Sequence, residues 1–191
     1  MNLIIQQLQA DHRQLVRILY HLEREVKAYG GFVGGKGKLE KILDILDYIQ
    51  VYPEIWHHPS EDIIYDVLTK KDAAAAAAVA DILAEHEVLE LLTENLLDYI
   101  NQLATADSDN IHGIRMRFIK STYDFVNRQL HHMEREQQQL FPLIDDCLGH
   151  DDWLEIKQRL KSLQPLLEVP LVQAYQSRYQ AIASGSALTA H

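Results

Sequence analysis

The chain has 191 residues, a formal net charge of -10 and a single cysteine. This length accommodates one domain with a substantial core, and one cysteine excludes an internal disulfide, which fits a reducing compartment. Because the basic residues are scattered, the composition argues against nucleic-acid and anionic-membrane partners. The N-terminus has no signal-peptide pattern, and no stretch approaches the about 18 apolar residues of a membrane span, so we expect a soluble cytoplasmic protein.

Helical periodicity runs along most of the chain. We expect helices at about 2–29, 38–70, 72–104 and 111–148, separated by a glycine-rich loop, a break after Lys71 and the turn TADSDN. Long helices with short connections predict an all-α, up-down-up-down antiparallel four-helix bundle.

The C-terminal part predicts short additional helices at about 151–163 and 169–182, followed by a flexible tail from about 184 to 191. We therefore divide the chain into a bundle domain, 1–148, and a C-terminal helical extension and tail, 149–191. The apolar C-terminal helices are compatible with a homodimer.

Histidine and glutamate recur at a spacing of four. Random placement predicts about 0.7 His-x-x-x-Glu pairs. The chain has His21/Glu25, His57/Glu61, His86/Glu90 and His132/Glu136. This spacing places both side chains on one helix face, one turn apart, so each pair can direct two ligands to one point. Helical bundles build carboxylate-bridged two-metal sites in this way.

The helix faces distinguish these pairs. His12, His86 and His132 lie on apolar stripes, whereas His21/Glu25 lies on a polar face and predicts an exposed ion pair. His131 also faces polar residues and is expected either at the surface or beside a metal ligand without binding metal itself. Carboxylates buried on apolar stripes are costly without a partner, which favours bound cations.

The second helix leaves two histidines as alternatives. The residues that share a helix face with His57, at steps of three and four, are mainly apolar, whereas those that share a face with His58 are mainly acidic. This difference favours His57 as the ligand. Pro53 and Pro59 can change the helix phase, so both alternatives stay open. Tyr65, one turn beyond Glu61, either donates a hydrogen bond near the metals or packs at the helix edge. The expected metal ligands are His12, His57, Glu61, His86, Glu90, His132 and Glu136.

Four segments, DHRQLVRILYHLE, HHPSEDIIYDVL, AEHEVL and HHMEREQQQLFPLI, resemble the hemerythrin-like, HHE cation-binding family over roughly residues 1–148. The resemblance implies a non-haem centre of two iron ions bridged by Glu61 and Glu136, although the donor types also suit manganese or zinc. It also implies how the other ligands divide. His12 and His57 would complete one iron and leave it an open position, and His86, Glu90 and His132 would complete the other.

Two positions depart from hemerythrin itself. Glu90 stands where the oxygen carrier has a second histidine, and Glu136 follows His132 by four residues where the carrier has an aspartate at five. An added carboxylate favours the ferric state, so we expect redox turnover or sensing rather than reversible oxygen carriage.

The sequence therefore predicts a di-iron protein that reacts with or senses dioxygen or hydrogen peroxide. Catalase-like peroxide decomposition and oxidase activity both stay open. The alternative is a metal- or oxygen-responsive sensor or interaction module without turnover. A purely structural bundle is disfavoured, because it would bury three carboxylates without compensation.

Overall fold

The structure, a computed structural model, describes residues 2–30, 36–106, 108–163 and 180. All regular secondary structure in these residues is helical, which confirms the expected all-α class. The helix expected at 169–182, apart from residue 180, and the tail expected at 184–191 lie outside the described residues. None of the described helices is both long and apolar enough to cross a membrane.

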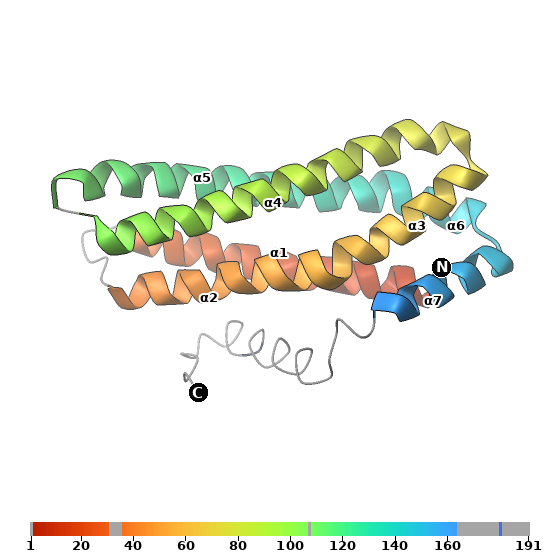
Figure 1. The fold of residues 1–191 in the computed structure, drawn as a ribbon, viewed down its shortest axis with the longest axis horizontal. Helices are drawn as coiled ribbons and strands as arrows, with labels where there is room; N and C mark the ends of the chain where they lie inside the picture. The colour runs from red at the N-terminus through yellow and green to blue at the C-terminus, as the bar shows by residue number, and fades with distance from the viewer. Residues whose placement is uncertain (1, 31–35, 107, 164–179, 181–191) are drawn as a thin grey trace.

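Long helices lie side by side along the molecule (Figure 1). They are α1 (Leu3–Gly30), α2 (Lys36–Tyr52), α4 (Ala76–Thr105) and α5 (Ser108–Arg135). Contacts join α1 to α2, α2 to α4, α4 to α5 and α5 back to α1, so each helix packs against two others in a closed ring. The arrangement lets each helix direct a buried face into a shared interior.

Wide π-helical turns interrupt the second and fourth expected helices. One spans Pro53–His57 and leads into α3 (His58–Lys71), and the other spans Glu136–Leu140 and leads into α6 (Phe141–Cys147). A proline follows each turn, and a proline ring clashes with the carbonyl group four residues earlier, which in both cases lies inside the π turn. Each wide turn inserts an extra residue and changes the phase of the helix that follows.

Two apolar clusters form the core. One contains Leu15, Leu19, Leu22, Ile49, Leu89, Phe118, Phe125 and Met133 among its members. The other contains Ile5, Leu8, Ile64, Leu68, Val79, Ile82, Leu140 and Ile144 among its members. The order along α1 shows what separates them, since Leu8 belongs to one cluster, Leu15 to the other, and the buried His12 lies between. A layer of buried polar side chains therefore divides the apolar core.

The last described helix, α7 (His150–Leu163), packs against α3. Its Trp153, Ile156 and Leu160 belong to the same apolar cluster as Ile64 of α3. Between α3 and α4, a short 3-10 helix spans Ala73–Ala75. The helix expected at 151–163 thus forms, and it packs against the apolar cluster on one side of the polar layer.

Candidate metal centre

Histidine and glutamate side chains from α1, α3, α4, α5 and the two π turns meet in the polar layer. Two groups have ligand atoms within 4.8 Å of one another. The first group consists of His12, His57, Glu61 and Glu136, and the second consists of His58, His86 and His132. Imidazole nitrogens and carboxylate oxygens at this spacing are suitable donors for transition-metal ions.

The first group is compact and completely buried. The Nε2 atoms of His12 and His57 lie 2.9 Å apart. Glu61 Oε1 lies 3.3 Å from His57 Nε2, and Glu136 Oε2 lies 3.3 Å from His12 Nε2. All four side chains are at most 2% exposed, so their charges are screened by each other and not by water.

The two glutamates also face the second group. His86 Nε2 lies 3.8 Å from Glu61 Oε2 and 3.7 Å from Glu136 Oε1, and His132 Nε2 lies 3.5 Å from Glu136 Oε2. His58 offers a ring nitrogen to this group, and its ring stacks on the ring of His86, with centroids 4.1 Å apart. Glu61 and Glu136 therefore lie between two sets of imidazoles, as bridging carboxylates would.

Several buried polar atoms in this layer make no hydrogen bond. They are Oε1 and Oε2 of Glu61, Oε2 of Glu136, Nε2 of His132 and both ring nitrogens of His86. A buried polar atom without a hydrogen bond typically costs about 1–3 kcal/mol, and a buried charge costs more. Cations placed between the two groups would satisfy these atoms except Nδ1 of His86, which faces Asp62, so the donor set fits metal binding.

The charges within the layer shift the pKa values of its members strongly. Burial opposes the charge on His57, but Glu61 and Asp11 outweigh burial and raise the histidine's pKa to about 10. Burial likewise opposes the charge on His86, while Asp62 and Glu136 raise its pKa to about 9. These histidines hold protons that bound metal ions would have to displace.

The glutamates show the opposite shift. Burial and the neighbouring Glu136 act to raise the pKa of Glu61, yet His57 and His12 lower it to about 2. Burial also acts to raise the pKa of Glu136, which His132 and His12 nevertheless bring well below its ordinary value. The electrostatics therefore keep both bridging candidates ionised, which is the form that binds metal.

Three of the histidines have a carboxylate beside the ring nitrogen that points away from the cluster. Nδ1 of His57 lies 3.5 Å from Asp11, Nδ1 of His86 lies 3.3 Å from Asp62, and Nδ1 of His132 lies 3.0 Å from Glu85. Such carboxylates fix the orientation of metal-binding imidazoles and make them more basic. Each of these carboxylates comes from a different helical segment than the histidine it contacts. The sequence patterns, which compare residues within one helix, therefore did not identify them.

Tyr65 resolves one of the sequence alternatives. Its buried hydroxyl donates a hydrogen bond to Glu136 Oε1 at 2.7 Å. The side chain thus reaches the polar layer as a donor, although the hydrogen bond goes to the glutamate of the fourth expected helix and not to its own neighbour Glu61.

The structure brings together six of the seven residues expected as ligands, namely His12, His57, Glu61, His86, His132 and Glu136. Glu90 does not join them, because its side chain is exposed. His58 lies in the second ligand group instead, although the residues at steps of three and four from it indicated a polar helix face. The π turn at Pro53–His57 explains the difference, since the phase of α2 does not continue through it into α3.

His131, His21 and Glu25 lie outside the centre, as expected. His131 is exposed, next to the buried His132. Glu25 forms an ion pair with Arg24, and its charge also acts on the imidazole of His21. Neither His21 nor Glu25 belongs to a ligand group.

The fold and the site define a helical protein with a buried histidine and carboxylate centre suited to cations. A family model described as the hemerythrin HHE cation binding domain matches residues 3–144, and the chain belongs to this family. The match covers all seven clustered residues. The comparisons with curated proteins and with solved structures gave no match.

Proposed function

We propose that this protein is a non-haem di-iron protein whose centre reacts with or senses dioxygen or hydrogen peroxide. The observation that carries the proposal is the pair of ligand groups that face one another across Glu61 and Glu136. Mixed imidazole and carboxylate donors suit iron, and also manganese or zinc. When bound, two irons would supply the redox chemistry that these side chains lack.

Each ligand group would hold one ion. His12 and His57 would bind the first, and His58, His86 and His132 would bind the second, with the two glutamates shared. Fewer imidazoles serve the first ion, so the open position that the family resemblance implies stays assigned to it. We propose Glu90 as a surface residue near the centre and no longer as a ligand.

The surrounding side chains orient the ligands and keep water out. Asp11 and Glu85 hold the rings of His57 and His132 by hydrogen bonds at Nδ1, and Asp62 places its charge 3.3 Å from Nδ1 of His86. The ring of Phe141 stacks on His12 with centroids 5.5 Å apart, which covers this ligand with an apolar surface. The Tyr65 hydroxyl oxygen lies 2.7 Å from Glu136 Oε1 and donates its hydrogen bond to this oxygen, which partly neutralises the buried carboxylate.

The exposed position of Glu90 changes the argument about oxygen carriage. The expected excess of negative charge at the centre rested on this residue as a ligand. With His58 in its place, the donor set has five imidazoles and two carboxylates, so charge no longer favours turnover over carriage. Binding of dioxygen and decomposition of peroxide therefore both remain part of the proposal.

We further propose the arrangement that would present this centre. The closed ring of helix contacts and the short connections support an up-down-up-down antiparallel bundle over residues 1–148, followed by a C-terminal extension over 149–191. A cytoplasmic location, a small oxidant as the partner in place of nucleic acid or membrane, and a homodimer complete the proposal.

The experiment is to load the metal-free protein anaerobically with ferrous iron, and then to add dioxygen or hydrogen peroxide in separate samples. We expect two irons per chain, a near-ultraviolet absorption change with either oxidant, and gas evolution with peroxide if the protein is an enzyme. The matched variants are His132→Ala, which should lose the absorption change, and the exposed neighbour His131→Ala, which should keep it. An iron-loaded protein that leaves both oxidants unchanged and shows no spectral response would refute the proposal.

A further inference from the structure

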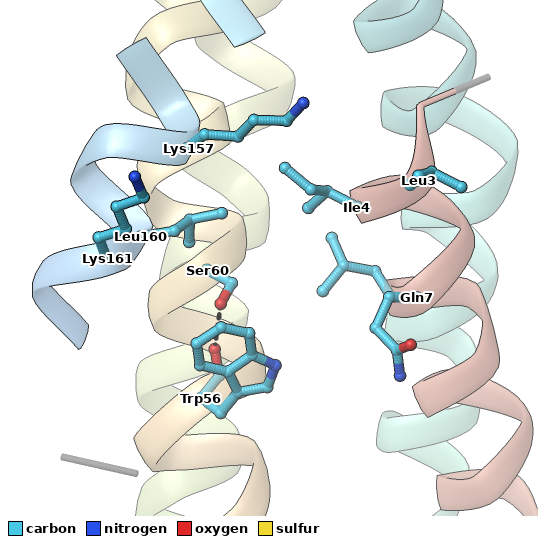
Figure 2. Close-up of a pocket in the computed structure, with 9 residues that line it drawn as sticks. Leu3, Ile4, Gln7, Trp56, Ser60, Lys157, Leu160 and Lys161 are labelled. Atoms are coloured by element: carbon cyan, nitrogen blue, oxygen red, sulfur yellow. Dashed lines mark hydrogen bonds between the residues drawn. The ribbon is translucent and has the colours of Figure 1, made fainter. Parts of the chain in front are cut away.

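Among the described residues, we compare three cavities near the metal centre, whose linings differ in charge. The first, of about 350 Å³, lies between α1, α3 and α7. Figure 2 shows Lys157 and Lys161 on its α7 side and Leu3 on its α1 side. Its walls are largely apolar and its charged groups are both cationic, so it is a poor route for a metal ion.

The second cavity, of about 280 Å³, lies beside His132 between α4 and α5. Its lining includes Glu85, Arg128 and His131. Glu85 is paired with Arg135 as well as with His132, so its negative charge is already compensated. Arg128 is likewise paired with Asp124, so this cavity presents no uncompensated carboxylate to attract a metal ion.

The third cavity, of about 350 Å³, lies between α3 and α4, and we call it the acidic cavity. Asp62, Glu87 and Glu90 line it together with His58 and His86. No Lys or Arg belongs to the described residues that line it. Of the three cavities, this one alone combines several carboxylates with direct access to two candidate metal ligands.

His86 connects the acidic cavity with the centre. The residue is 8% exposed, and neither of its ring nitrogens makes a hydrogen bond. Its Nδ1 lies 3.3 Å from Asp62, which lines the cavity, whereas its Nε2 lies 3.8 Å from Glu61 inside the centre. Asp62 is half exposed, so the chain of donor atoms runs from solvent through Asp62 and His86 to the bridging carboxylates.

We propose that the acidic cavity is a transient site for divalent cations, through which metal ions enter the centre. Its three carboxylates attract and partly desolvate the cation, and His86 then passes it inward. Oxygen donors of this kind bind divalent cations weakly while the ion keeps several waters, whereas the buried imidazoles and glutamates hold it more tightly. Glu90 thereby acquires a role in loading, next to the ligands but outside the centre. The inference rests on the metal centre proposed above.

The test is the rate at which the metal-free protein takes up Co²⁺, followed by stopped-flow visible absorption. At low ionic strength we expect the variant Glu87→Gln/Glu90→Gln to load about fivefold more slowly than the unaltered protein, because it lacks two attracting charges. The difference should disappear at about 0.5 M salt, where charges are screened over a few ångströms. The final cobalt content and the final spectrum should be unchanged, because neither residue is a ligand.

The matched control removes the same charge elsewhere on α4. Glu94 and Asp98 are exposed on this helix and do not line the acidic cavity. The variant Glu94→Gln/Asp98→Asn should load at the unaltered rate. Loading of the Glu87→Gln/Glu90→Gln variant at the unaltered rate, or an equal loss in the control, would overturn the inference while leaving the centre intact. Failure of the unaltered protein to bind cobalt would refute the centre itself.

Discussion

The hydrogen bond from Tyr65 to Glu136 gives a measurable test of the polar layer. Replacing Tyr65 by Phe keeps the ring in its fully buried position and removes only the hydroxyl. A hydrogen bond to a charged group contributes about 1.5–3 kcal/mol. The other oxygen of this carboxylate, Oε2, makes no hydrogen bond. Removing the Tyr65 hydroxyl therefore leaves both oxygens of the buried Glu136 without a hydrogen-bond donor. We expect the metal-free protein to lose about 2 kcal/mol of stability, or about 4–8 °C in Tm.

Metal binding should reduce this loss, because a cation beside Glu136 compensates the carboxylate directly. Urea unfolding of the metal-free and iron-loaded forms measures both values. Tyr29→Phe is the control, since this tyrosine is also buried and its hydroxyl makes no hydrogen bond among the described residues. Equal stability of Tyr65→Phe and the unaltered metal-free protein would refute the assignment of Tyr65 as the donor that supports Glu136.

Three further predictions concern ligands and protons. His132→Ala should weaken iron binding by more than about 100-fold, whereas His131→Ala should leave it unchanged, as measured by competition with a chelator. By the same measurement, His58→Ala should weaken binding at least about tenfold and Glu90→Gln by less than about twofold; the reverse order would restore the sequence-based ligand set. The last prediction uses the two histidine pKa values of about 9 and 10. Both values lie above the ordinary histidine pKa of 6.5. The contribution of these two groups to the stability of the metal-free protein is therefore complete below pH 6.5 and is lost as the pH rises through 10. Metal binding tightens over the same range, because fewer protons have to be displaced. Urea unfolding and proton release on metal addition, followed from pH 6 to 10, measure both trends; stability that rises over this range would contradict the assignment.

The helical fold and the burial of His12 could be predicted because α1 is regular. Steps of three and four residues from His12 stay on one face of such a helix, and the apolar residues at those steps are buried as expected. The same reasoning fails where the helix changes its pitch. The π turn before His58 rotates the following residues relative to α2, and nothing in the local sequence beyond the neighbouring prolines indicates the size of that rotation.

Glu90 shows a different limit, because α4 is regular around it. His86 lies at the edge of the buried face, whose centre follows Ile82, Leu89 and Leu96. In an α-helix, three residues turn about 60° short of a full circle and four turn about 40° beyond it. From an edge position, the step of three therefore leads to the buried Leu89, and the step of four leads outward to the exposed Glu90. A spacing of four cannot reveal this without the position of the neighbouring helices.

The central claim is that two iron ions bind in the polar layer, and anomalous diffraction from crystals of the iron-loaded protein tests it most directly. The account predicts two iron peaks, one between His12 and His57 and the other among His58, His86 and His132, with Glu61 and Glu136 in contact with both. An iron coordinated by Glu90, or the absence of iron from the polar layer, would contradict it.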